Sequence, residues 1–183
     1  MDLAADKRMI DSCLSGDRQA QYELYGKYCK GMFNVCLRMI NDRNEAEDVL
    51  QNAFIEVFGK LKYFRYESAP GAWIKRIVVN QCINHLRKRR PVLTESGELP
   101  ESTAEETGTD PELNVGRIRN AIAQMPDGYR TIFCLYAMEG YDHGEIAEIM
   151  DISESTSKSQ YSRARSKLYD ILKESGDINR LYE

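Results

Sequence analysis

The chain has 183 residues and a formal net charge of -4, and 42% of its residues are hydrophobic. This length suits one medium-sized domain or two small ones, and no apolar run is long enough to cross a bilayer. The five cysteines include no CxxC pair and only two histidines occur, a composition that offers no common zinc spacing and favours reduced thiols. We therefore expect a cytoplasmic protein without cofactor, metal or direct membrane insertion.

Charge is distributed unevenly along the chain. Residues 60–90 hold nine Lys or Arg and one Glu, a net charge of +8, whereas residues 91–116 hold seven acidic residues and no basic one. A basic segment next to an acidic segment indicates separate tasks for the two. Helix formers are plentiful and no long run alternates with period two, so the fold class we expect is all-α.

The first three predicted helices cover 3–15, 18–40 and 44–63, with Asp17 as the cap of the second. The third has an apolar stripe and a polar face. Such a face is usually solvated surface; a paired-carboxylate catalytic site is the alternative, but no His, Lys or glycine-rich loop converges on it in sequence. The residues of the polar face are Glu45, Asp48, Gln51, Asn52 and Glu56.

A loop over 64–72 leads into the most basic helix, which runs to Arg90 with Ser68 as its expected cap and Pro70 in its first turn. The aromatic side chains of the loop, among them Tyr66, can stack on unpaired bases or close the loop onto the helices. The last four residues of the helix are all basic. Cations at this end complement the helix dipole, but four are more than that requires, and together they would attract a phosphate backbone. A solvated basic helix end is the alternative. Polar residues off the apolar stripe are Lys75, Arg76, Asn80, Asn84, Arg87, Lys88, Arg89 and Arg90.

Residues 91–111 are rich in Glu, Ser, Thr, Gly and Pro and predict a flexible acidic linker. Helices are then expected over 112–124 and from 127 to about 138. A capping box from Asp142 to Glu145 starts a short helix, and Ser153 caps a long one that ends near Lys173.

A short helix, a tight turn and a longer helix are the arrangement of a helix-turn-helix. One face of the last helix could enter a major groove and read base edges with hydroxyl, amide and guanidinium groups. An ordinary polar face on a helical hairpin is the alternative. The residues of this face and its surroundings are Ser155, Thr156, Lys158, Ser159, Gln160, Arg163, Arg165 and Lys167.

Three stretches, in this order, resemble the extracytoplasmic-function (ECF) sigma factors of bacterial RNA polymerase, in the sigma-70 family. They are DRNEAEDVLQNAF, WIKRIVVNQCINHLRKRR and MPDGYRTIFCLYAMEGYDHGEIAEIMDISESTSKSQYSRARSKL. The resemblance implies sigma region 2 over 1–90, a linker over 91–111, sigma region 4 over 112–175 and a tail over 176–183. It also implies a non-enzymatic subunit, monomeric when free, that directs promoter-specific transcription initiation.

The same resemblance implies partners and site residues. The polymerase core would be bound through its β′ clamp and β flap, with Glu45, Asp48, Gln51 and Asn52 on the clamp, and an anti-sigma factor is the expected regulator. Promoter DNA at the -10 element would be met by Tyr66, Lys75, Arg76, Asn80, Asn84, Arg87, Lys88, Arg89 and Arg90. The -35 element would be read by Ser155, Thr156, Lys158, Ser159, Gln160, Arg163 and Arg165.

Three residues depart from the family's pattern: Asn84 stands where Asp is frequent, Ser157 where an apolar residue is usual, and Asp151 where Gly is common. One rival is a free-standing helix-turn-helix regulator, a class that usually dimerises on two half-sites; the acidic third helix and the separate basic helix argue against it. A helical enzyme is the other rival, but no nucleophile, base and orienting group occur together.

Overall fold

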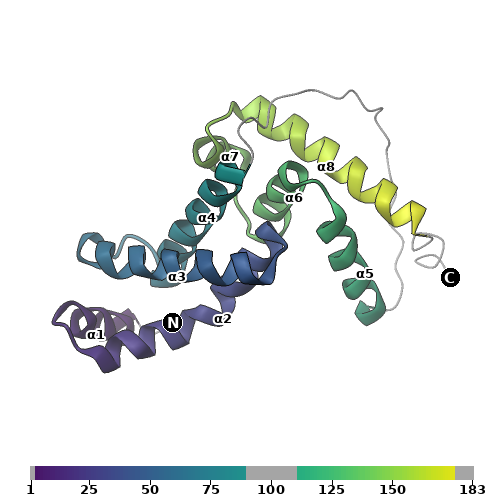
Figure 1. The fold of residues 1–183 in the computed structure, drawn as a ribbon. Coiled ribbons are helices and arrows are strands. Elements are labelled where there is room, and N and C mark those ends of the chain that lie inside the picture. Colours follow the sequence, from purple (N-terminus) through teal and green to yellow (C-terminus); the bar gives the residue numbers. More distant parts are fainter. Residues whose placement is uncertain (1–2, 90–110, 176–183) are drawn as a thin grey trace. The chain divides into compact units, whose positions relative to one another are not determined.

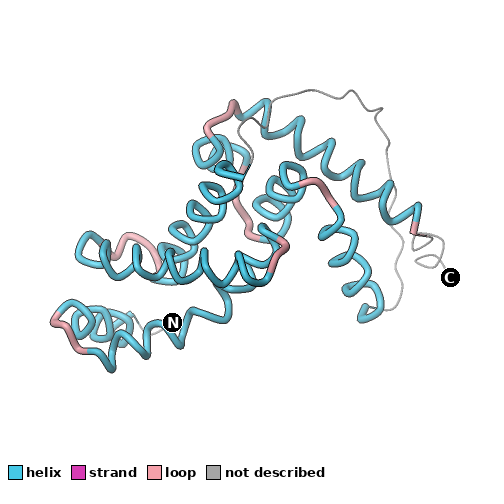
Figure 2. The backbone as a smooth tube through the Cα atoms, viewed as in Figure 1, coloured by secondary structure: helices cyan, strands magenta, loops and turns pink. Residues whose placement is uncertain are grey.

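The computed structural model describes residues 3–89 and 111–175 of the chain, and side chains from Ala5 to Arg89 and from Val115 to Ser175. Every regular element in these residues is helical, as expected for an all-α protein. The chain divides into two compact units, Met1–Arg89 and Arg90–Glu183, whose helices are drawn in Figures 1 and 2. The predicted linker up to residue 110, Arg90 and the predicted tail lie outside the described residues.

The first unit contains α1 (Leu3–Leu14), α2 (Arg18–Ile40), α3 (Arg43–Lys60), the 3-10 turn η1 (Leu61–Tyr63) and α4 (Pro70–Arg89). Asp17 caps α2 as predicted, accepting hydrogen bonds from the backbone N–H groups of Gln19 and Ala20. The third helix differs slightly from the prediction. Asp42 caps the helix by accepting from the Glu45 N–H at 2.9 Å, so the helix starts at Arg43, one residue before the predicted start. The last predicted turn of the helix tightens into η1.

Ser68 does not cap α4, so that prediction is wrong. The helix begins at Pro70, whose missing N–H suits a first helical position. The Ala69 carbonyl accepts from the Trp73 N–H at 3.2 Å, which places Ala69 at the cap position and Ser68 before it. The fixed φ of proline and this backbone bond start the helix without a side-chain cap.

Helices α2, α3 and α4 pack against one another and enclose the core of the first unit, while α1 packs on α2. A glycine eases one close approach: a Cβ at Gly71 would lie 3.0 Å from Cε1 of Tyr28, tighter than an ordinary contact, so glycine lets α4 approach α2 there without displacing that ring. All five cysteines are free. The largest fully buried side chains of this unit are Ile10, Leu24, Met39, Ile74, Val57, Val78, Val79 and Cys36.

The second unit contains α5 (Pro111–Gln124), α6 (Asp127–Phe133), the π-helical turn η2 (Cys134–Met138), α7 (His143–Met150) and α8 (Glu154–Glu174). Pro111 is thus the first residue of α5 instead of the last of the linker. The helix predicted from 127 to 138 is present, but its second half widens to π geometry. Helix α8 packs on α5, α6 and α7 and holds the unit together.

Arg130 is a buried cation in this unit, with a relative exposure of 3%. Its guanidinium donates to the carbonyl of Met125 at 2.7 Å and to the Asp127 carboxylate at 2.6 Å. The side chain therefore satisfies a carbonyl at the end of α5 and ties it to the start of α6.

The capping box of α7 has both of its predicted bonds. The Asp142 carboxylate accepts from the Glu145 N–H at 2.8 Å, and the Glu145 carboxylate accepts from the Asp142 N–H at 2.9 Å.

Replacing Asp142 by alanine is expected to cost about 1 kcal/mol of stability. Faster amide hydrogen exchange along α7 would show it, with Asp170→Ala on α8 as a control that removes no cap. Unchanged exchange in Asp142→Ala would contradict this value.

Candidate nucleic-acid and protein interfaces

The outer face of α3 has the composition of a protein-binding surface. Asp48, Gln51 and Asn52 are exposed, and Ile55, one turn further on, has a relative exposure of 71%. These positions are three and four residues apart and therefore share one side of the helix. An exposed isoleucine among polar side chains resembles an apolar interface anchor inside a polar surround. The sequence prediction contained the three polar residues and missed Ile55, whose exposure follows only from the packing of the helix.

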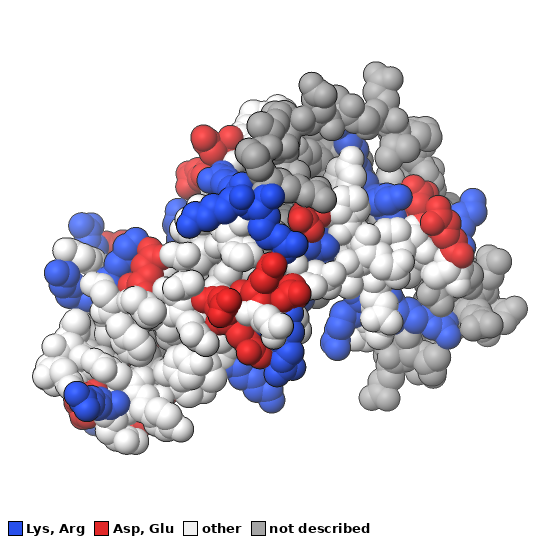
Figure 3. Space-filling model, in the orientation of Figure 1, with Lys and Arg blue, Asp and Glu red and all other residues white. Residues whose placement is uncertain are grey.

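Glu45, which the sequence predicted as part of the same polymerase-binding set, makes its hydrogen bonds within the first unit. Its Oε2 accepts from Nε2 of His85 at 3.0 Å and from the Arg89 guanidinium. The carboxylate therefore joins the start of α3 to the basic end of α4. Figure 3 shows red side chains over the first turns of α3 and blue ones over the last turns of α4. Glu56 makes a second link, because it accepts from Lys60 and from Gln81 of α4, hydrogen bonds that lower the pKa of Glu56.

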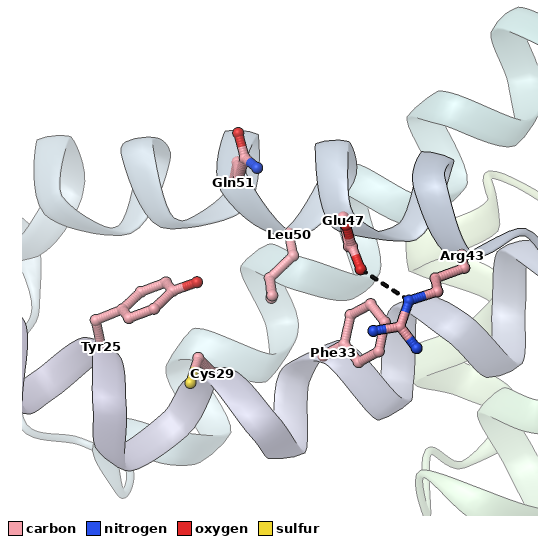
Figure 4. Close-up of a pocket in the computed structure, with 7 residues that line it drawn as sticks. All are labelled: Tyr25, Cys29, Phe33, Arg43, Glu47, Leu50 and Gln51. Atoms are coloured by element: carbon pink, nitrogen blue, oxygen red, sulfur yellow. Dashed lines mark hydrogen bonds and ion pairs between the residues drawn. The ribbon is translucent and has the colours of Figure 1, made fainter.

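A groove of about 380 Å³ lies between α2 and α3, next to the polar face (Figure 4). Its walls include the rings of Tyr25 and Phe33 and the side chain of Leu50. At one end Nε of Arg43 donates to Glu47 at 3.0 Å, and the guanidinium lies 5.6 Å from the centroid of the Phe33 ring. The groove can therefore accept an apolar side chain and offers an ion pair to a polar one. The lining residues are Tyr25, Cys29, Phe33, Arg43, Glu47, Leu50 and Gln51.

Helix α4 carries a polar stripe along its exposed side. Arg76, Asn80, Asn84 and Lys88 recur every four residues and are all exposed, so they follow one side of the helix. Arg87 and Arg89 lie in the last turn of α4 beside Lys88 and are exposed, whereas Lys75 is half-buried. The arrangement offers amides in the middle of the stripe and cations at its end, which suits base edges and phosphates respectively.

The loop before α4 is closed onto the unit by its aromatic residues. Phe64 is buried, and its ring centroid lies 5.2 Å from that of Trp73 and 4.8 Å from that of Tyr66. Tyr66 is half-buried and has a left-handed backbone, with φ of 60°. Of the two interpretations of these aromatics, closure of the loop is what the structure shows.

The helix-turn-helix consists of α7, the turn at Asp151 and α8. Asp151 adopts the left-handed conformation, with φ of 56°, that Gly would adopt more easily. Ser155, Lys158, Ser159 and Arg165 are exposed, and Thr156, Gln160 and Arg163 are half-buried. Lys158 pairs with Glu154 of the same helix at 2.7 Å, an exposed contact of small energy that a phosphate could replace.

Ser157, the unusual polar residue of α8, is fully buried and satisfied. Its hydroxyl lies 3.0 Å from Nδ1 of His143, the first residue of α7. The His143 ring stacks on Tyr136 with centroids 4.4 Å apart, and Tyr136 contacts Tyr161 of α8 at the same distance. A hydrogen bond inside an aromatic cluster thus replaces the usual apolar contact between the two helices.

Within residues 3–89 and 111–175, no helix has the length and hydropathy needed to cross a membrane. The same residues contain no group of three or more His, Cys, Asp or Glu side chains placed to hold a metal ion.

Two family models match the chain: Sigma-70 region 2 over residues 24–92 and Sigma-70, region 4 over residues 116–168. Among curated proteins, the RNA polymerase sigma-H factor of Pseudomonas aeruginosa is 32% identical over 176 residues, covering 89% of this chain and 91% of that protein. The ECF RNA polymerase sigma factor SigW of Bacillus subtilis is 29% identical, covering 92% and 97%. The chain belongs to the ECF sigma factors of the sigma-70 family.

Solved structures of other proteins share the fold of this sigma factor. One is the sigma factor RpoE of Bartonella quintana in complex with the anti-sigma factor NepR, at 24% identity and a TM-score of 0.58, covering 83% of this chain and 96% of that one. Another is CnrH in complex with the cytosolic domain of CnrY, at 21% identity and a TM-score of 0.56, covering 92% and 97%. The region 2 match begins inside α2, so α1 of this sigma factor lies outside both matched segments.

Proposed function

We propose that this sigma factor is a dissociable promoter-specificity subunit that binds core RNA polymerase, reads the -35 and -10 elements and helps to open the promoter. The observation that carries the proposal is the match of regions 2 and 4, in order, to two units that each present an exposed polar helix face. Residues 1–90 would form region 2, 91–110 the linker, 111–175 region 4 and 176–183 a tail, with the boundary at the first residue of α5.

The outer face of α3 is the proposed contact with the β′ clamp. Asp48, Gln51 and Asn52 would provide the polar rim, and Ile55 together with the groove between α2 and α3 would provide apolar contacts that lose water on binding. Glu45 would contribute indirectly, by holding the basic end of α4 through His85 and Arg89. The contact of region 4 with the β flap is proposed on the family resemblance.

The stripe on α4 is the proposed contact with the -10 element. Arg87, Lys88 and Arg89 would bind duplex phosphates and release counterions, while Asn80 and Asn84 would bond to the edges of bases. Unstacking a base costs a few kcal/mol, and contacts made only by the open strand offset that cost. No covalent chemistry is needed, so we assign no enzymatic activity to the chain.

Helix α8 is the proposed reader of the -35 element. Arg163 and Gln160 have the groups that bond guanine and adenine edges in the major groove, while Lys158 and Arg165 would hold the phosphates. The chain would act in the cytoplasm, where it would be monomeric when free. An anti-sigma factor that covers these surfaces would keep it inactive.

Reconstitution tests this function. The purified chain is mixed with bacterial core polymerase, and co-elution is followed by transcription from a template pool randomised over the -35 and -10 elements. We expect a one-to-one complex and transcripts from a subset of templates. A chain that binds DNA as a dimer and ignores polymerase would instead be a free-standing regulator.

Ile55 gives a further prediction. Replacing it by serine is expected to change the stability of the first unit by less than about 0.5 kcal/mol, because the side chain is exposed, and to weaken binding to core polymerase about tenfold, a loss of roughly 1.4 kcal/mol. Leu14→Ser, at another exposed apolar position, is the control and should bind normally. Equal affinities of the two variants would remove Ile55 from the interface.

A further inference from the structure

Helix α1 is fixed firmly to the body of the first unit although it lies outside the matched region 2. Ile10 and Cys13 are buried on its inner side, with relative exposures of 1% and 4%. Asp6 is also buried, and its carboxylate pairs with Lys27 of α2. The hydrogen bond to Asp6 raises the pKa of Lys27. Apolar burial and an ion pair therefore hold α1 at one position on α2.

Two side chains of α1, one helical turn apart, reach the loop that precedes α4. The Tyr66 hydroxyl donates to Oδ1 of Asp11 at 3.2 Å. The ammonium group of Lys7 lies 5.9 Å from the centroid of the Tyr66 ring, within the range of a cation–π contact. Partial burial, followed by the nearby Asp11 carboxylate, raises the pKa of Tyr66, so the phenol stays a neutral donor. Tyr66 is thus held from outside its own loop.

These contacts hold Tyr66 in an unfavourable backbone conformation. A φ of 60° is rarely adopted by a bulky residue and persists only where surrounding contacts enforce it. The Tyr66 ring then packs on Phe64, and Phe64 packs on Trp73 in the first turn of α4. A continuous set of contacts therefore runs from α1 through the loop to the first turn of α4.

We propose that α1 is a positioning element for the loop at 64–69, with Asp11 as the positioning residue that fixes Tyr66 in the conformation that meets the -10 element. The inference rests on the proposed -10 contact of the first unit, which the family resemblance extends to this loop, and goes beyond it by giving α1 a task. A loop already held in its binding conformation loses less conformational freedom when it captures unpaired DNA. Removal of the contact should therefore slow opening and leave polymerase binding unchanged.

The test compares four single variants and one double variant of the full chain. Asp11→Ala removes the acceptor, and Asp11→Asn keeps an oxygen that accepts the same hydrogen bond. Tyr66→Phe removes only the donor. Glu23→Ala is the matched control, because it removes an exposed carboxylate of the same unit that lies outside the loop and bonds to Gln19 of its own helix. Amide exchange over 64–69 is measured in the free chain, and core binding and opening rate are measured with holoenzyme on templates selected by the wild-type chain.

Asp11→Ala and Tyr66→Phe are each expected to slow opening about fivefold, the fold-change that corresponds to one hydrogen bond, and to speed amide exchange in the loop. Their double variant should be no slower than either single variant, because both remove the same bond. Asp11→Asn and Glu23→Ala should stay within about twofold of wild type. Templates already mismatched across the -10 element should restore part of the lost rate.

Three results with Asp11→Ala would overturn the inference alone. Opening at the wild-type rate would show that the contact has no role, and faster opening would show that it inhibits opening. A loss of affinity for core polymerase as large as the loss of opening rate would show that the contact only supports the fold. A wild-type chain that neither binds core polymerase nor opens any template would overturn the proposed function and this inference with it.

Discussion

Reversing the charge of Asp48 to lysine together with Gln51→Ala is expected to weaken binding to core polymerase about 30-fold or more, the loss typical of an interface hot spot. Both side chains are exposed on α3, whose opposite side is buried in the core, so their loss removes surface contacts without opening a cavity. Helicity should be unchanged. The measurement is equilibrium binding of labelled chain to core polymerase.

Glu23→Lys is the control for that experiment, since it reverses an exposed charge on α2 whose contact is with Gln19 of the same helix. It should bind almost as wild type does. Undiminished affinity in the Asp48 and Gln51 double variant would remove the polymerase contact from the outer face of α3.

Arg163→Ala is expected to weaken recognition of the -35 element by ~1–3 kcal/mol and to relax its sequence preference, because a guanidinium that bonds a base edge discriminates between bases. Lys158→Ala is the matched comparison on the same helix. A phosphate contact carries no sequence information, so this variant should weaken binding to all sequences alike. It should also reduce the slope of log K against log salt concentration by about one. Binding to -35 duplexes of varied sequence and salt measures both.

Two further variants, compared with Arg163→Ala, separate the two DNA-reading units. Asn80→Ala and Tyr66→Ala should impair opening more than initial duplex binding, since Asn80 is proposed to bond base edges of the open strand and Tyr66 to hold the loop that meets that strand. Templates mismatched across the -10 element should rescue part of these defects and none of the Arg163→Ala defect. Equal rescue of all variants would show that duplex recognition and promoter opening are not divided between the two units.

Local signals in the sequence predicted the helices well. The caps at Asp17, Asp142 and Ser153 are present because each needs only a side chain and a backbone N–H two or three residues away. Ser68 was the wrong choice for α4 because proline and the Ala69 carbonyl start that helix without a side-chain cap. The widening of the helix after Phe133 into a π-helical turn has no local signal that we can identify.

Contacts between distant segments could not be read from the sequence. Glu45 has the spacing of a solvated docking residue, yet it meets His85, 40 residues further on. The bond between Asp11 and Tyr66 spans 55 residues, and nothing local indicates that Tyr66 adopts a left-handed conformation. Ile55 and the groove between α2 and α3 likewise depend on how two helices pack. The stripe from Arg76 to Lys88 was predictable because a spacing of four residues is a property of one helix.

The central claim is that this chain gives core polymerase its choice of promoter. The most direct measurement is transcription from the randomised template pool by core polymerase with and without the chain, followed by sequencing of the templates used. The account predicts that the chain is required, and that the selected templates share two short elements whose upstream preference is relaxed by Arg163→Ala. Identical template use with and without the chain, or selection of inverted half-sites in the absence of polymerase, would contradict it.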